Sequence, residues 1–496
     1  MDILINLIIF LPLLFALIIY MPIFPKDDKV IRHISKFSAS AVMILLAILC
    51  IFFDFSNPNY CLETSTSWIN ILGINVSFVC NPISMMLAIL LNFIFLIVFI
   101  QSKGIIKHNS RLYYALILII QTCTTSALFT NDFFIFYMIL TALIIPVYVL
   151  LLNYADSKKM PNSFLLFKTS SLVFFLLAFL LMYYLNFKYS GVLSSDINDI
   201  NISDFSEYTK TIIITLLITG FLINFPTVPF HKHYTKAVTS SLTPVSILIA
   251  IILFDVYAFG FFKYVIQLFQ GELPNYTTIL ILIGTINIVY SLIAILFEKN
   301  IKQIICYSGI IYSGIFITGI CSLTQEGMTG AIFLLITYSL TALGLYIFNE
   351  IIFRNYGTYN KNKISQLSTK APRLTITAIV FLLSFITMPL LPQFNASLLC
   401  FLGSFLSNDT IAPKLYTIIS IITVAIMSVY LLTIYCKMFM GERNIKSGKI
   451  SDIHAKPAVI LLFISVLIVI AGIFPSFIID IISNYVSNIY DMIGAY

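Results

Sequence analysis

Long apolar segments dominate this chain, and they constrain its fold more than any other feature. Hydrophobic residues make up 60% of its 496 residues, and charged residues make up only 10%. A soluble domain carries about 25% charged residues, so this chain has too few charges to cover a surface that faces water. We therefore predict an all-α polytopic membrane protein.

A helix that spans a bilayer needs about 20 mostly apolar residues. The sequence contains fourteen such segments, at residues 3–22, 37–55, 81–101, 112–130, 131–153, 163–187, 211–230, 241–268, 277–297, 302–322, 328–352, 373–406, 413–438 and 456–479. The first segment starts with Asp2 instead of a basic region, so we expect a retained helix and not a signal peptide. The residues after the last segment have an amphipathic pattern, which predicts a helix along the membrane surface.

Positive charges alternate between the predicted loops. Cytoplasmic loops carry the excess of Lys and Arg, and the first loop here holds Lys29, Arg32 and Lys36. The second loop carries Asp54 and Glu63 instead, and the later loops continue this alternation. The pattern supports fourteen helices and predicts that both termini lie on the non-cytoplasmic side. It also accounts for the net charge of +7 without a nucleic-acid partner.

Two predicted helices contain the same pair of helix breakers. The segment "INFPTVPF" holds Pro226 and Pro229, and "TMPLLPQF" holds Pro389 and Pro392. Proline removes a backbone donor and clashes with the preceding turn, and paired interruptions often mark the sites of transporters built from repeats. We predict that both helices are broken and that the chain contains an internal repeat.

The eight cysteines are scattered, and no two have the C-x-x-C spacing of a metal or haem site. The sequence also lacks a Gly-rich nucleotide loop. We therefore expect no metal and no cofactor. Cys61 and Cys80 flank one external loop, so a disulfide or two free thiols are both compatible with the sequence, and we favour free thiols.

Four stretches resemble one known family, the antiporter-like membrane subunits shared by respiratory complex I and the multisubunit Na⁺/H⁺ antiporters. They are "NDFFIFYMILTALIIPVYVLL", "GFLINFPTVPFHKHYTKAV", "EKNIKQIICYSGIIYSG" and "FITMPLLPQFNASLLCFL". The chain is most similar to the M-type subunit of complex I and the D-type subunit of the antiporters, as a divergent member. The resemblance implies two inverted five-helix repeats, with helices 7 and 12 broken. It divides the chain into residues 1–111, 112–268, 277–438 and 456–496.

The resemblance also implies a row of ionisable residues that carry protons across the membrane. The sequence departs from that row at most positions. Neutral residues stand where the family has charged or titratable ones, namely Thr141, Asn224, Tyr312, Thr337, Thr341 and Ser397, and Asp255 stands where the family has a lysine. Together with His231 and Lys263, these residues are the candidates for a proton or ion path.

Two functions follow from this comparison. The first is a non-redox membrane subunit of an NADH-quinone oxidoreductase or Na⁺/H⁺ antiporter assembly, with proton or cation translocation impaired by the lost charges. The second is a non-conducting structural paralog that keeps only the fold and the contacts with partner subunits. Either would lie in a bacterial cytoplasmic membrane beside other membrane subunits. A stand-alone redox enzyme has no support in the sequence.

Overall fold

The computed structural model describes residues 2–21, 27–57, 60–106, 108–157, 159–200, 202–407, 411–441, 452 and 455–494. Some charges of the predicted loops lie outside these residues, namely Lys26, Lys107, Lys158, Asp409, Arg443, Lys446 and Lys449. The described chain is mostly helical, as the apolar segments predict. It forms two compact units, one of residues 1–225 and 240–273 and the other of residues 226–239 and 274–494.

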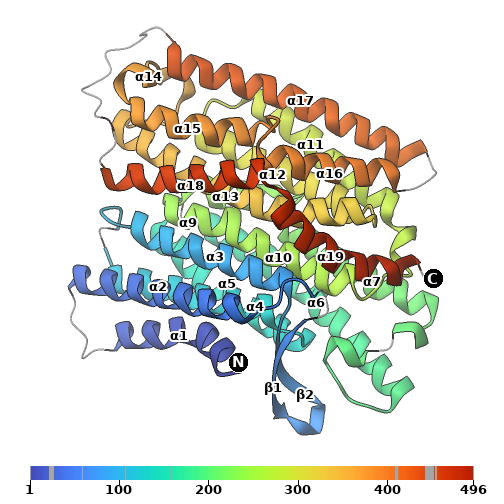
Figure 1. The fold of residues 1–496 in the computed structure, drawn as a ribbon. Helices are drawn as coiled ribbons and strands as arrows, with labels where there is room; N and C mark the ends of the chain where they lie inside the picture. Colours follow the sequence, from blue (N-terminus) through green and yellow to red (C-terminus); the bar gives the residue numbers. More distant parts are fainter. Residues whose placement is uncertain are drawn as a thin grey trace. The chain divides into compact units, whose positions relative to one another are not determined.

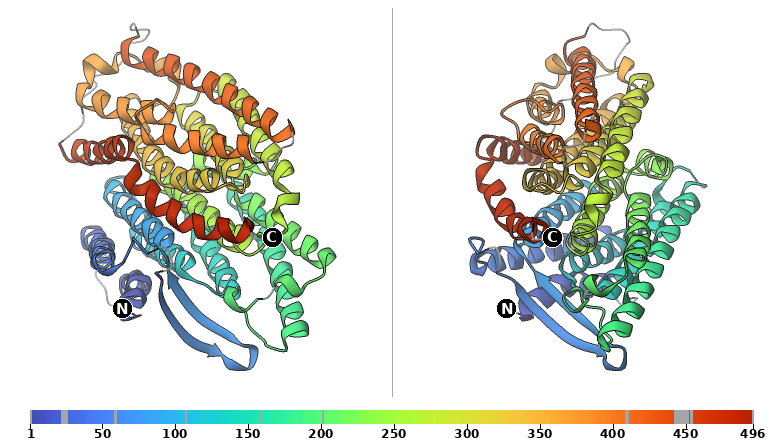
Figure 2. Two further views of the ribbon diagram at one scale, coloured as in Figure 1. Left: turned by 45° about the vertical axis from the view of Figure 1, so that its right-hand side comes forward. Right: turned by 90° about the vertical axis from the view of Figure 1, so that its right-hand side faces the viewer.

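Helices make up most of the first unit (Figure 1). Its elements are α1 (Asp2–Tyr20), α2 (Asp28–Phe52), β1 (Leu62–Ile69), β2 (Ile74–Cys80), α3 (Pro82–Gln101), α4 (Ser110–Phe129), α5 (Phe133–Tyr154), α6 (Met160–Ser190), α7 (Glu207–Asn224), α9 (Thr243–Ile247) and α10 (Leu253–Phe261). Helix α4 packs against α1, α3 and α5, and α6 packs against both α5 and α7. The strands β1 and β2 pair antiparallel into a hairpin that the sequence did not predict (Figure 2).

The span Thr243–Ile266 is buried along its length in the first unit, and its helix is not regular. A π-helical turn at Leu248–Ile252 precedes α10, and a second π-helical turn at Phe262–Ile266 follows it. Such turns are rare and often occur at functional sites. They flank the helical segment that carries Asp255, and the second of them contains Lys263.

The described part of the second unit is mostly helical. Its helices are α8 (His231–Ser240), α11 (Thr277–Phe297), α12 (Ile301–Ile320), α13 (Gln325–Tyr356), α14 (Leu367–Lys370), α15 (Pro372–Phe385), α16 (Pro392–Leu406), α17 (Ile411–Met440), α18 (Ala455–Ile473) and α19 (Ser476–Gly494). Helix α13 is the buried centre, since it packs against α12, α15, α16, α18 and α19. The predicted helix after the last span is α19, which meets α18 at a bend of 64°.

The two Pro-x-x-Pro segments break their helices as predicted. The first helix stops at Asn224 and α8 begins at His231, so Pro226 and Pro229 lie in the break. The second stops at Phe385 and α16 begins at Pro392, with Pro389 between them. Eleven helices of the described chain are long and apolar enough to cross a membrane, or twelve if α18 and α19 form one span. The two broken segments fail this test because each half is short or less apolar, so the count of fourteen stays a prediction, as do the repeats and their boundaries.

Large apolar side chains remain exposed on the outer helices, as expected for a surface that faces lipid. Examples are Ile48 on α2, Leu166 on α6, and Ile422 and Val429 on α17. Cys61, just before β1, and Cys80, the last residue of β2, are both free cysteines in the structure, and the absence of a disulfide between them stays a prediction.

Candidate functional site

A buried lysine marks the end of α7 in the first unit. The sequence places Lys168 about two turns inside α6, where only 3% of its surface is exposed. Its ammonium Nζ donates to the side-chain oxygen of Asn224 at 3.0 Å and to the Asn224 main-chain oxygen at 3.2 Å. It also lies 4.3 Å from the centre of the Tyr257 ring, within the range of a cation–π contact.

Asn224, the last residue of α7, connects α7 to α6 through its side chain. Its amide nitrogen donates to the Ser171 hydroxyl at 2.8 Å and to the Gly220 carbonyl at 3.2 Å. The resemblance predicts a lysine at position 224, and the structure brings an ammonium group to the side chain there from the neighbouring helix. Lys168 was not among the candidates predicted from the sequence. The signal that could have found it is a lysine inside an otherwise apolar span, which is costly unless it has a role.

Asp255 and Lys263 lie on the span that follows. Asp255 is fully buried on α10. The Lys263 ammonium, also buried, donates to the Thr130 carbonyl at 2.7 Å, and the Tyr264 hydroxyl donates to the same oxygen at 3.2 Å.

Two carboxylates lie near the α4–α5 connection, to which Lys263 also bonds through Thr130. Asp132 caps the start of α5 by accepting from the Ile135 amide at 2.9 Å, and it accepts a hydrogen bond from the Ser195 hydroxyl. Burial raises the pKa of Asp132 above its usual value. Asp196 accepts from the Ser77 hydroxyl at 3.0 Å and from the Asn131 amide at 2.8 Å. These contacts join the hairpin to the α4–α5 connection.

Thr141 lies half-buried on α5, and its hydroxyl donates to the Tyr137 carbonyl at 2.9 Å. Both residues belong to α5, so this hydrogen bond is local to one helix and does not join Thr141 to the other candidates.

Neutral side chains hold the broken helix of the second unit. The Tyr312 hydroxyl donates to the Phe385 carbonyl at the end of α15, and the Ser428 hydroxyl donates to the Ile386 carbonyl at 2.8 Å. Thr341 donates to the Thr337 carbonyl on α13. The bonds to Phe385 and Ile386 satisfy carbonyls at the helix break that would otherwise be unpaired in hydrophobic surroundings, whereas the Thr341 bond lies inside α13.

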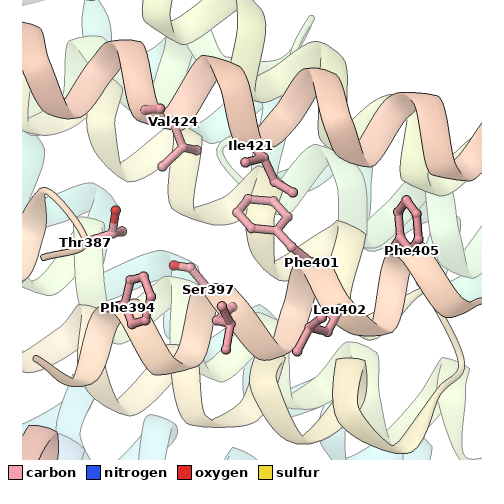
Figure 3. Close-up of a pocket in the computed structure, with 10 residues that line it drawn as sticks. Thr387, Phe394, Ser397, Phe401, Leu402, Phe405, Ile421 and Val424 are labelled. Atoms are coloured by element: carbon pink, nitrogen blue, oxygen red, sulfur yellow. The ribbon is translucent and has the colours of Figure 1, made fainter. Parts of the chain in front are cut away.

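Ser397 faces a cavity of about 330 Å³ between α16 and α17. Figure 3 shows Ser397 beside Phe394 and Phe401, with Val424 across the space. The Ser397 hydroxyl has no hydrogen-bond partner in the described part of the chain. The lining is almost entirely apolar, so this space contains no group that holds a charge.

His231 begins α8 and is buried in the second unit, with its ring centre 4.7 Å from that of Tyr290. Residues His231, Tyr312, Thr337, Thr341 and Ser397 therefore lie in the second unit, whereas Thr141, Asn224, Asp255 and Lys263 lie in the first. The described residues contain no group of three or more His, Cys, Asp or Glu side chains that could hold a metal ion.

The fold and these buried polar groups place the chain among the polytopic helical membrane proteins with broken helices. The chain belongs to the NADH:quinone oxidoreductase/Mrp antiporter transmembrane family, whose model matches residues 130–428. This confirms the resemblance seen in the sequence.

Relatives of known name align over nearly the whole chain. NADH-quinone oxidoreductase subunit M of Rickettsia prowazekii is 25% identical over 494 residues, which cover 98% of each chain. NAD(P)H-quinone oxidoreductase chain 4 of the Anthoceros angustus chloroplast is 27% identical and covers 98% of this chain and 97% of its own.

Solved structures have the same fold. A chain of respiratory complex I from Thermus thermophilus superposes with a TM-score of 0.86 at 19% identity, covering 99% of this chain and all of that one. A chain of the Mrp complex from Dietzia sp. DQ12-45-1b gives a TM-score of 0.85 at 14% identity, covering 99% and 98%. The protein is thus a membrane subunit of the complex I and Mrp antiporter family, whose members translocate protons.

Proposed function

We propose that this chain is a membrane-embedded subunit of a complex I-like, NADH-quinone oxidoreductase assembly, in which it translocates protons at a reduced capacity. Its partners are the other membrane subunits of that assembly and the surrounding lipid. The full-length similarity to subunit M chains supports this assembly over a Mrp-type antiporter. The alternation of loop charges supports a bacterial cytoplasmic membrane with both termini on the non-cytoplasmic side.

One observation carries the proposal: ionisable side chains remain buried within the spans of the first unit. They are Lys168, Asp255 and Lys263. An ionisable side chain in the middle of a membrane costs about 2.5–3.5 kcal/mol even on the mildest scale, so those that persist usually serve transport. The candidate positions of the second unit's spans carry Tyr312, threonines and a serine. The reduced capacity follows, because neutral hydroxyls do not carry a net charge across a low-dielectric region.

A non-conducting structural paralog is the second candidate. The hydroxyls of Thr141 and Thr341 favour it, since each donates to a carbonyl of its own helix four residues before. A hydroxyl that is hydrogen-bonded in this way has a structural role within the membrane and needs no role in a hydrated path.

Reconstitution separates the two candidates. The complete assembly is placed in liposomes with quinone and NADH, and proton uptake per NADH oxidised is compared for the wild-type chain, Asp255→Asn and an assembly that lacks this chain. We expect the wild type to exceed the assembly without the chain and Asp255→Asn to fall between them. Equal uptake with and without the chain would establish the structural role. The same measurement with K⁺ in place of Na⁺ tests whether Na⁺ moves.

A further inference from the structure

The ammonium of Lys168 lies at the C-terminal end of α7, where the helix is interrupted. A continuous helix would cap the Asn224 carbonyl with the amide four residues later, at Val228. That amide donates instead to the Asn287 side-chain oxygen at 2.6 Å. The Asn224 carbonyl therefore accepts from Lys168, at the negative end of the helix dipole. Lys168 thus caps the C-terminal end of α7.

The surroundings of Lys168 are neutral. No carboxylate forms a salt bridge with it among the residues that the structure describes. Two oxygens of Asn224 and the Tyr257 ring stabilise its charged form, and each of these groups also tolerates a neutral amine. A buried lysine paired with a carboxylate stays charged, whereas one paired with dipoles can change its protonation state at a smaller cost.

Asn224 suits both protonation states because its amide has an acceptor and two donors. In the structure its oxygen faces the ammonium, and its nitrogen faces the Ser171 hydroxyl. Rotation of the amide by half a turn would offer an N–H to the lone pair of a neutral amine and would turn the oxygen to Ser171. The Ser171 hydroxyl, which donates to the Lys168 carbonyl at 2.8 Å in the structure, would then turn to donate to this oxygen. An aspartate at this position would match only the charged lysine.

We propose that Lys168 is a proton-carrying residue of this subunit and that Asn224 is its positioning partner. The inference rests on the proposed function and names a residue that performs it. In the step, an N–H bond of the ammonium breaks, the electron pair stays on Nζ, and the proton passes to a water molecule; uptake of a proton from water on the other side restores the ammonium. The chain gains or loses no electrons.

The test uses the reconstituted assembly with Lys168→Met, Lys168→Arg and the control Lys188→Met. Lys188 lies on the same helix and is exposed, so its replacement removes an equal charge outside the buried site. Arginine keeps the charge and the hydrogen bonds but cannot release a proton in a protein. We expect both Lys168 variants to lose the proton uptake that the chain contributes, at an unchanged rate of NADH oxidation, and Lys188→Met to keep it.

Each outcome decides the matter. Wild-type uptake in Lys168→Arg would overturn the proposal, because a fixed charge would then be enough and the lysine would have only a structural role. Failure of both Lys168 variants to assemble, with normal assembly of Lys188→Met, would overturn it in the same way. If the wild-type chain adds no proton uptake over the assembly that lacks it, the proposed function itself fails. If the wild-type chain adds uptake and the Lys168 variants add as much, only the role of Lys168 fails.

Discussion

Replacement of two buried asparagines by leucine should have opposite effects on stability. Asn224 hydrogen-bonds to Lys168 and Ser171 on α6 through its side chain. Asn186, on α6, is equally buried, but neither its side-chain oxygen nor its nitrogen has a hydrogen-bond partner among the described residues. Leucine is close to asparagine in shape, so both changes mainly remove the amide.

The magnitude for Asn224→Leu follows from the bonds lost between the two helices. A hydrogen bond to a charged group contributes at least about 1.5 kcal/mol, and a neutral bond between membrane helices contributes about 0.6 kcal/mol on average. Lys168 keeps the Asn224 main-chain oxygen and the Tyr257 ring, so it does not become an isolated charge. We expect a loss of about 2 kcal/mol in the free energy of unfolding.

Asn186→Leu should leave stability unchanged or raise it by about 1 kcal/mol, because an unsatisfied buried polar group is destabilising. Both variants and the wild type are purified as the assembly in mild detergent, and unfolding is followed by circular dichroism as temperature rises. Equal losses for the two variants would refute the hydrogen-bond assignment, since the change in side-chain chemistry is the same.

Three further outcomes are expected. Gly403→Ala should lower the unfolding temperature of the purified assembly, because a Cβ at Gly403 would lie 2.4 Å from backbone atoms of Gly327 on α13, and overpacking of this kind costs about 1–3 kcal/mol; an unchanged midpoint would contradict the close packing of these helices. Burial raises the pKa of Asp132 above its ordinary 3.8, so the folded state penalises the charged form and loses stability as the pH rises through the folded pKa. Asp132→Asn should therefore be more stable than the wild type at pH 7, and the difference in melting temperature should shrink as the pH falls toward 3.8. A difference that does not change with pH would contradict a raised pKa for Asp132. Tyr312→Phe removes the bond to the α15 carbonyl and should cost about 1 kcal/mol of stability while leaving proton uptake intact; reduced uptake by a stably assembled variant would place the second unit in the path.

The sequence by itself determined the membrane class, the mostly helical fold and the two breaks. These features depend on local properties, namely runs of apolar residues and the missing amide of Pro226, Pro229, Pro389 and Pro392. The family followed from stretches with specific order and spacing. The hairpin of β1 and β2 has only a partial signal in the sequence, because β2 alternates apolar and polar residues from Ile74 to Phe78 whereas β1 is mostly polar.

Only the tertiary structure decided which polar residues meet. Lys168 and Asn224 are 56 residues apart in the chain, and their contact depends on how α6 is rotated against α7, which no local pattern encodes. The same packing leaves Thr141 with a bond inside its own helix and places Ser397 at a cavity, where its hydroxyl has no hydrogen-bond partner among the described residues. A buried charge costs free energy that neighbouring helices must offset, so its position can be understood only when those neighbours are known.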